Sequence, residues 1–166
     1  MFTTDAQTAE TVSFDTVKRY ITQHELENGR LSKLLRYYRG EHDILKRKKE
    51  DAAAPNSRLV CNHAKEIADT AVGYFVGNPI TYNGDGAEVL REWFTAADID
   101  GVDMALAKNM GIYGRGYELI CMSDEESPTP KSYSVDPRGA FVVYDDTVEH
   151  KPLFGVYYFP TFDPDG

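Results

Sequence analysis

Three places in the chain carry residue types that could do chemistry. The first is the glycine pattern Gly111-x-x-Gly114-x-Gly116, which looks like a phosphate-binding loop. No Gly-Lys-Ser or Gly-Lys-Thr follows it, and it lies after an expected helix and before an expected strand, the reverse of the order in a nucleotide site. A helix C-terminus presents carbonyl oxygens, which repel phosphate. The pattern therefore predicts a helix end and a tight turn into a strand.

The second place is an acidic cluster near the end of the chain. Asp145, Asp146, Glu149 and His150 supply carboxylate and imidazole groups that could hold a divalent cation. The same composition is typical of a solvated turn between two strands. The turn is the expected structure, and a small metal-dependent enzyme acting on nucleic acid is the alternative function that the cluster supports.

The third place is the pair Cys61 and His63. No residue near them would orient the histidine as a base, so a nucleophilic cysteine is not expected. Cys61 and Cys121 lie far apart and form no CxxC motif, and we expect each to be a small buried side chain. GxSxG and HExxH motifs are absent from the sequence. We therefore predict no catalysis, no cofactor and no metal.

Apolar periodicity predicts two helices in the first forty residues. Ser13 is expected to cap the first helix, and Asn28-Gly29 is expected to break it. The second is expected over residues 30–39, with Gly40 as its C-cap. The side chains expected to face the core are Phe14, Val17, Tyr20, Ile21, Leu31, Leu34, Leu35 and Tyr38.

Three further helices are expected after a polar, basic segment at residues 41–57, which should be a surface loop with a short ordered piece at Ile44-Leu45. They run from a cap at Asn62 to about Val76, over residues 87–96, and over residues 101–113, with a short strand at 79–82. The side chains expected to face inward are Ile67, Ala68, Ala71, Val72, Val89, Leu90, Trp93, Phe94, Met104, Leu106, Ala107 and Met110.

From residue 116 onward the chain is rich in strand signals. Alternation and β-branched or aromatic residues predict short strands from 117, at 133–135, at 140–144 and at 153–159, forming a mainly antiparallel small sheet. Helices followed by strands indicate an α+β fold. Residues 1–12 should form a flexible arm and residues 13–166 one folded unit. The turn signal Asp163–Gly166, with no strand after it, predicts that the chain is part of a longer protein.

The net charge of −9 is unevenly distributed. Residues 30–58 carry nine Lys and Arg against four Asp and Glu, whereas residues 85–166 carry six against sixteen. Such a basic island invites nucleic acid or an acidic partner, although a run as short as Lys46–Lys49 is also typical of a solvated loop. No signal peptide and no membrane-spanning run of about 20 apolar residues is recognisable, so a soluble, unsecreted protein is expected. The 11 tyrosines suit either protein contacts or a core.

Taken in order, six short segments resemble the portal protein family of long-tailed double-stranded DNA bacteriophages, a type common in phages and prophages of Gram-positive bacteria. The resemblance covers residues from about 15 to 160. The segments are LLRYYRGEH (34–42), NSRLVCN (56–62), ADTAVGYFVGNPITY (68–82), AKNMGIYGRGYE (107–118), VDPR (135–138) and VYDDTVEHKP (143–152).

The resemblance implies a structural subunit of the portal ring, usually a dodecamer, at one capsid vertex of the virion, assembled in the host cytoplasm. Its implied partners are other portal subunits, the terminase, the head–tail connector, capsid and scaffold proteins, and double-stranded DNA, which is packaged and later ejected through the ring. Family members are much longer, so this chain resembles the N-terminal part of the outer wing domain, truncated before the stem, clip and crown. A non-functional prophage remnant is a further alternative.

The resemblance also gives the basic island two possible partners. Six basic residues of the island, named at the end of this paragraph, could contact DNA phosphates without sequence preference. They could instead contact the acidic C-terminal half of a neighbouring subunit. We favour the neighbouring subunit, because oppositely charged faces steer assembly. The residues are Arg36, Arg39, Lys46, Arg47, Lys48 and Lys49.

Overall fold

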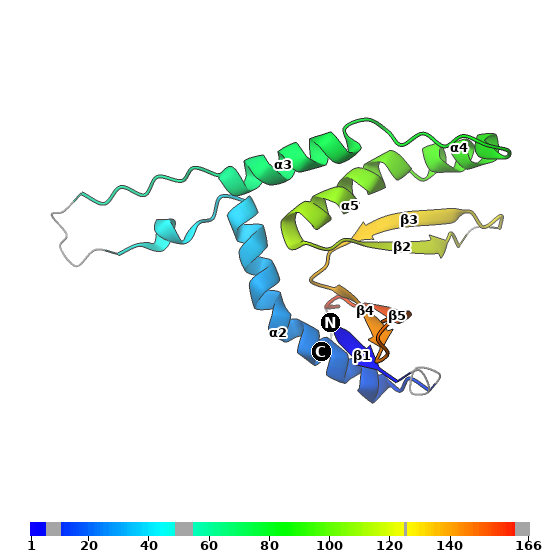
Figure 1. Ribbon diagram of the computed structural model, residues 1–166, viewed down its shortest axis with the longest axis horizontal. Helices are drawn as coiled ribbons and strands as arrows, with labels where there is room; N and C mark the ends of the chain where they lie inside the picture. The colour runs from blue at the N-terminus through cyan, green and yellow to red at the C-terminus, as the bar shows by residue number, and fades with distance from the viewer. Residues whose placement is uncertain (6–10, 49–54, 125, 162–166) are drawn as a thin grey trace.

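The computed structural model describes residues 1–5, 11–48, 55–124 and 126–161. Its helices are α2 (Phe14–Tyr38), α3 (His63–Val76), α4 (Ala87–Ala96) and α5 (Ile99–Tyr113), and its strands are β1 (Phe2–Thr4), β2 (Tyr117–Met122), β3 (Pro130–Val135), β4 (Ala140–Asp145) and β5 (Pro152–Tyr157). Figure 1 shows α3, α4 and α5 together at one side, with α2 running away from them past the small sheets. Helices precede most of the strands, which confirms the α+β class.

The first long helix is continuous, although the sequence predicts two. Ser13 caps it as predicted, because its Oγ accepts a hydrogen bond from the backbone N–H of Thr16 at 3.3 Å. The predicted break at Asn28-Gly29 is wrong. The Asn28 side chain donates to the carbonyl oxygen of Arg138 at 3.0 Å, and a glycine inside a helix costs only about 1 kcal/mol relative to alanine. Tertiary contacts on this face therefore outweigh the local preference for a turn.

Gly40 ends α2, as predicted. Its φ of +81° is the left-handed conformation that terminates a helix and that glycine adopts without strain. The 3₁₀ turn η1 (Asp43–Lys46) follows and contains the ordered piece predicted at Ile44-Leu45. Around this turn the described residues of the predicted surface loop are mostly exposed.

The remaining helices have nearly the predicted bounds. Asn62 caps α3, because its Oδ1 accepts a hydrogen bond from the backbone N–H of Lys65 at 3.1 Å. The helix packs along α5 and ends at Val76, as predicted. The strand predicted at Pro79–Tyr82 does not form, and these residues are an irregular connection to α4.

Several side chains predicted to face the core are exposed. Ala68 and Ala107 are buried as predicted, but Phe14 is 80%, Ile67 70% and Val89 72% exposed. For Ile67 and Val89 the reason is the position of α3 and α4 at the outside of the helical layer (Figure 1), where only a narrow stripe of each helix meets a neighbour. Phe14 is the first residue of α2, where the helix begins. The predicted apolar stripes are wider than the faces that the fold covers.

The strands fall into two small sheets. In the first, the order is β1-β4-β5, with β1 parallel and β5 antiparallel to β4. The second is the antiparallel pair β2 and β3, in which Leu119 lies opposite Tyr133. The single sheet that the sequence predicts is thus divided in two, because the connection after Val135 turns the chain away at Asp136–Gly139.

The main core lies where β1 and β4 meet the first half of α2. Phe2, Phe141 and Val143 are buried, and the ring centroids of the two phenylalanines are 4.9 Å apart. The prediction of a flexible arm at residues 1–12 differs from the structure over Phe2–Thr4, which form an edge strand paired with Val143–Asp145. Residues 6–10, the rest of that arm, and the turn signal at 163–166 lie outside the described residues.

The Asp136–Gly139 corner connects α2 with both sheets. The Arg138 guanidinium pairs with the Asp136 carboxylate at 2.6 Å, and the Arg138 carbonyl oxygen accepts hydrogen bonds from Asn28 and from the hydroxyl of Tyr158. Gly139 passes so close to Tyr158 that a Cβ at Gly139 would lie 2.6 Å from its carbonyl oxygen. One of the six segments on which the resemblance rests, VDPR, is therefore a structural corner.

Candidate functional site

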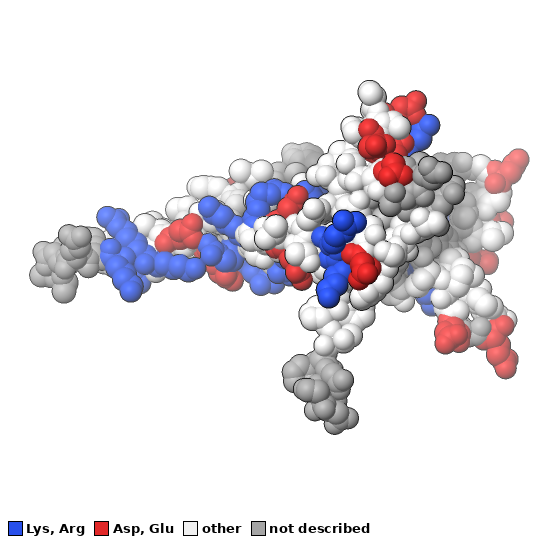
Figure 2. Space-filling view, turned by 90° about the horizontal axis from the view of Figure 1, so that it is seen from below, with Lys and Arg blue, Asp and Glu red and all other residues white. Residues whose placement is uncertain are grey.

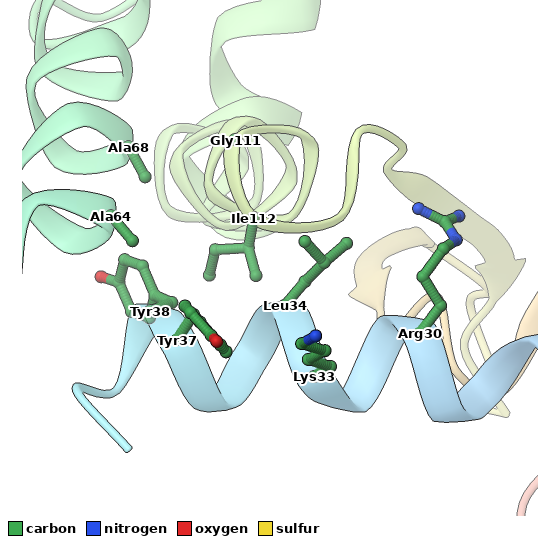
Figure 3. Close-up of a pocket in the computed structure, with 9 residues that line it drawn as sticks. All are labelled: Arg30, Lys33, Leu34, Tyr37, Tyr38, Ala64, Ala68, Gly111 and Ile112. Atoms are coloured by element: carbon green, nitrogen blue, oxygen red, sulfur yellow. The ribbon is translucent and has the colours of Figure 1, made fainter. Parts of the chain in front are cut away.

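A pocket of about 420 Å³ lies where α2, α3 and α5 meet. Figure 3 shows Leu34 of α2 and Ile112 of α5 pointing into it, with Ala64 and Ala68 of α3 along one side. Gly111 brings α5 close to α3 at this point, since a Cβ there would touch Ala68 at van der Waals distance. Three helices thus surround an apolar hollow that the protein's own side chains do not fill.

Positive charges surround this junction. The Lys33 ammonium lies 5.7 Å from the centre of the Tyr37 ring, and the ammonium groups of Lys65 and Lys108 lie 5.4 and 5.2 Å from the centre of the Tyr38 ring. Cations at these distances are attracted to the faces of aromatic rings. The pocket is therefore apolar at its base and electropositive at its edge.

A polar network fixes the end of α2. The Asp43 carboxylate accepts a hydrogen bond from the Tyr37 hydroxyl at 3.0 Å and pairs with the Arg36 guanidinium at 2.5 Å. The hydrogen bond from Tyr37, assisted by Arg36, lowers the pKa of the Asp43 carboxyl below its ordinary value. The His42 ring lies against Tyr37, with the ring centroids 4.8 Å apart. Arg36, one of the six predicted patch residues, is therefore already paired within its own chain.

A second network joins α2 to α3. The Asp69 carboxylate forms an ion pair with Lys65 and accepts a hydrogen bond from the Tyr38 hydroxyl at 2.6 Å. These two contacts, the Lys65 contact first, lower the pKa of the Asp69 carboxyl. The capping residue Asn62 also donates from its side chain to the carbonyl oxygen of Tyr38 at 2.9 Å. The start of α3 is thus held directly on the end of α2.

Most of the other predicted patch residues lie on a projecting segment that we call the basic arm, formed by residues 41–48 and 55–62 (Figure 1). Two hydrogen bonds connect its two legs: Arg58 donates to the carbonyl oxygen of Leu45 at 3.1 Å, and Asn56 to that of Arg47 at 3.4 Å. Figure 2 shows basic side chains gathered along the arm, and acidic ones toward the other end of the molecule.

The structure brings only part of the predicted patch together. Lys46, Arg47 and Lys48 are exposed on the arm, and within the described residues none of them forms an ion pair. Arg39 is exposed at the end of α2, and Lys49 lies outside the described residues.

The acidic cluster at the end of β4 is part of a turn. Asp145 is only 6% exposed, and its Oδ1 accepts hydrogen bonds at 2.9 Å from the Thr147 hydroxyl and from the backbone N–H of Lys151. The Glu149 carboxylate pairs with the Lys151 ammonium at 2.6 Å. Across the described ranges, no group of three or more acidic, His or Cys side chains is arranged to hold a metal ion. The geometry therefore gives the metal-enzyme alternative no support.

Two smaller predictions have opposite outcomes. The prediction that Cys61 and Cys121 are buried is wrong: both are exposed and free, one on the basic arm and one on β2. The prediction of a helix end in the glycine pattern is confirmed. Gly114 has a φ of +74°, and its N–H donates to the carbonyl oxygen of Met110 at 2.9 Å. This is the geometry that ends α5 and leads into β2.

Sequence reasoning missed Arg30 and Lys33, whose side chains help to line the pocket. One signal could have found them: both stand on the same helix face as Leu34 and Tyr37, at spacings of three and four residues. The described residues include no helix that is both long and apolar enough to cross a membrane.

The described part of the molecule presents a projecting basic arm and an unfilled apolar hollow, and it offers no arranged metal-binding cluster. Exposed apolar surfaces of this kind mark contact sites for other molecules. The family described as phage portal protein, SPP1 Gp6-like, matches residues 17–166. The chain therefore belongs to this family of phage portal proteins, which is a structural family. A comparison with the curated proteins finds no match.

Proposed function

We propose that the chain is a subunit of the portal ring at one vertex of the phage capsid, and that it performs no catalysis. The observation that carries this proposal is the family match, which extends over nearly the whole chain. In the proposed ring, residues 13–166 form the N-terminal part of the outer wing domain. Double-stranded DNA would enter through the ring under the action of the terminase and leave through it at ejection.

The other proposed partners follow from that position. Further portal subunits would complete the ring, usually a dodecamer, and the head–tail connector would dock on it. Capsid and scaffold proteins would meet its outer side during assembly in the host cytoplasm. The exposed apolar side chains on several elements support a role in assembly, because monomeric proteins rarely leave such surfaces uncovered.

We further propose that the basic arm faces an acidic neighbouring subunit and not DNA. Residues 85–166 carry ten more acidic than basic side chains, so a neighbour offers an opposite charge for the arm. The arm also carries the exposed apolar residues Leu45 and Leu59, at 41% and 81%, which a phosphate backbone does not require.

Immunogold electron microscopy of phage particles tests the portal position. Antibodies against this chain should label a single vertex of the head, where the tail attaches. Label spread over the whole capsid, or confined to the tail, would contradict the proposal. A particle preparation from a strain that lacks the gene serves as the control for antibody specificity.

A double-stranded DNA retention assay over a salt series tests the assignment of the arm. The variant Arg47→Ala/Lys48→Ala should retain DNA no less than the matched variant Lys18→Ala/Arg19→Ala, which removes two exposed cations from α2. If the arm contacted DNA, its neutralisation would weaken retention selectively and reduce its salt dependence. That outcome would identify DNA, and not an acidic neighbouring subunit, as the partner of the basic arm.

A further inference from the structure

The outer side of α3 is an apolar surface that the rest of the described chain leaves uncovered. The inner side of the helix, with Ala64 and Ala68, lies at the junction with α2 and α5. The two residues that we call the α3 surface are Ile67 (70% exposed) and Tyr74 (90%), which lie seven residues apart on one helix face. Figure 1 shows α3 at the outer edge of the molecule, with α5 beneath it. Two large apolar side chains at this exposure indicate a contact site.

A second uncovered surface lies on the other sheet. We call Ile120 (60% exposed) and Met122 (60%), which lie two residues apart on one face of β2, the hairpin surface. In the described residues β2 and β3 pair only with each other, so the outer edge of each is unpaired. The register puts Tyr133 on the opposite face, so it is not part of this surface. The ribbon is supported by α5, which packs on β3, and a partner on the exposed apolar side chains would add to its stability.

The two surfaces carry opposite charges at their ends. The basic arm leads into the N-terminus of α3, and its Lys46, Arg47 and Lys48 form no ion pair with any residue that the structure describes. The turn that joins β2 to β3 exposes Asp124 and Glu126, and neither forms an ion pair within the described part. Figure 1 shows the arm and this turn pointing to opposite ends of the molecule. Each end therefore has an apolar patch followed by a charged extension, and the two extensions carry opposite charges.

We propose that the α3 surface and basic arm of one copy dock on the hairpin surface and acidic turn of a second copy. This inference rests on the proposed function, because it names the surfaces through which portal subunits meet. The contact is head to tail: each copy uses a different surface on each side. Such heterologous contacts form a closed ring when the rotation between copies is constant and divides a full turn.

Other occupants fit the observations less well. DNA would be attracted by the arm but repelled by the acidic turn, and it would leave both apolar surfaces exposed. An unrelated acidic protein could cover the α3 surface, but it would leave the hairpin surface unexplained. A second copy accounts for both surfaces with one contact.

The two native cysteines test this geometry without any engineered label. Cys61 lies on the basic arm just before α3; Cys121 lies between Ile120 and Met122 in β2, with its side chain on the opposite face of the ribbon, and both cysteines are exposed. A flexible bismaleimide long enough to pass the edge of the ribbon should therefore join Cys61 of one copy to Cys121 of the next and produce a ladder of dimers, trimers and larger species. Cys61→Ser and Cys121→Ser should each abolish the whole ladder.

Three results would overturn the proposal. One is the absence of any crosslinked species at concentrations at which sedimentation shows association. Another is crosslinking that stops at dimers and survives one of the single substitutions, which would indicate that the same surface meets itself. The third is crosslinking that appears only when double-stranded DNA is added, which would make DNA the bridging partner.

Substitutions on the two surfaces add a quantitative test. Tyr74→Glu should raise the dissociation constant, measured by sedimentation, about tenfold or more, because it places a charge in an apolar contact. Val148→Glu is the matched control: Val148 is 97% exposed but lies outside both surfaces, so association should not change. Lys46→Glu/Arg47→Glu should weaken association, and Asp124→Lys/Glu126→Lys should restore it in the combined variant. Equal effects of Tyr74→Glu and Val148→Glu would contradict the proposal.

The outcomes also separate this inference from the proposed function. Single-vertex immunogold labelling together with a failed ladder would leave the portal position intact and refute only the interface. A correct ladder with label away from the vertex would establish the interface and refute the portal position.

Discussion

The sheet-containing end and the helical end of this molecule differ in how they treat their apolar side chains. Around β4, Phe141 and Val143 are at most 1% exposed, and they pack against the first half of α2. On α3, Tyr74 is 90% exposed although its ring is as large as that of any core residue. The core around β4 covers its own apolar side chains, whereas α3 leaves an apolar side chain uncovered. The difference teaches that the residues that stabilise this chain are not the residues of the proposed assembly contact.

The largest effect should come from the core. Phe141→Ala removes a fully buried ring next to Phe2 and should lower the free energy of unfolding by about 3–5 kcal/mol. Denaturant unfolding followed by circular dichroism measures the change. Phe14→Ala is the matched control, because Phe14 is 80% exposed and its loss should cost no more than about 0.5 kcal/mol. Similar losses for the two variants would mean that burial of the ring does not explain the contribution of Phe141 to stability.

The free energy of unfolding should be nearly as sensitive to a substitution at the Asp136–Gly139 corner between the sheets. In Gly139→Ala the new Cβ would lie 2.6 Å from the backbone carbonyl oxygen of Tyr158, so the corner must shift, at a cost of about 1–3 kcal/mol. Gly29→Ala is the matched control. It has open space inside α2 and should stabilise the protein by about 0.4–1 kcal/mol. Thermal unfolding of both variants should thus give shifts of opposite sign, and a neutral Gly139→Ala would show that the corner is not closely packed.

Acid should weaken the sheet-containing end through His24. This residue is fully buried, and its Nδ1 lies 2.8 Å from the Tyr158 hydroxyl. Burial, assisted by Arg115, lowers the pKa of His24 below the ordinary 6.5, against the opposing effect of Glu27 and Glu25. The folded protein therefore binds this proton more weakly than the unfolded chain does. The contribution of His24 to stability is complete above pH 6.5 and declines as the pH falls through the folded-state pKa.

Measurement of the free energy of unfolding above and below pH 6.5 checks whether protonation of His24 lowers stability. The wild-type free energy of unfolding should fall on acidification below pH 6.5, and His24→Gln should flatten that part of the curve. Tyr158→Phe separates titration from hydrogen bonding, since it removes the contact to Nδ1 but keeps the ring. An unchanged pH profile in His24→Gln would assign the acid sensitivity to other groups.

The smallest effect on stability should come from the helical end. Tyr74→Ala removes a side chain that the monomer leaves 90% exposed, so the free energy of unfolding of the monomer should change by no more than about 0.5 kcal/mol. The proposed self-association should nevertheless weaken. A loss of stability above 2 kcal/mol would mean that Tyr74 packs within its own chain, and the contrast between the two ends would disappear.

Much of the helical layer could be predicted from sequence, because its signals are local. Ser13, Asn62 and Gly40 mark helix boundaries through hydrogen bonds and backbone angles within a few residues of the chain. The bounds of α4 and the glycine turn after α5 follow for the same reason. The break predicted at Asn28-Gly29 failed because its competitor is distant: the contact with Arg138 lies 110 residues away.

The candidate site was less predictable than the helices. The basic run was visible as composition, but the pairing of Arg36 with Asp43 depends on how η1 folds back on α2. The pocket requires three helices to meet, and no spacing along one helix reveals it. The exposure of Cys61 and Cys121 runs against the usual burial of cysteine, and local sequence gives no sign of it.

By itself the sequence determined the α+β class, most helix ends, the uneven charge and the resemblance to phage portal proteins, because each depends on residue type and short-range order. Only the tertiary structure decided that Phe2 enters a sheet with β4, that the strands divide into two sheets, and which apolar stripes stay exposed. These outcomes depend on contacts between residues far apart in the chain, and their energies are settled only when the surfaces meet.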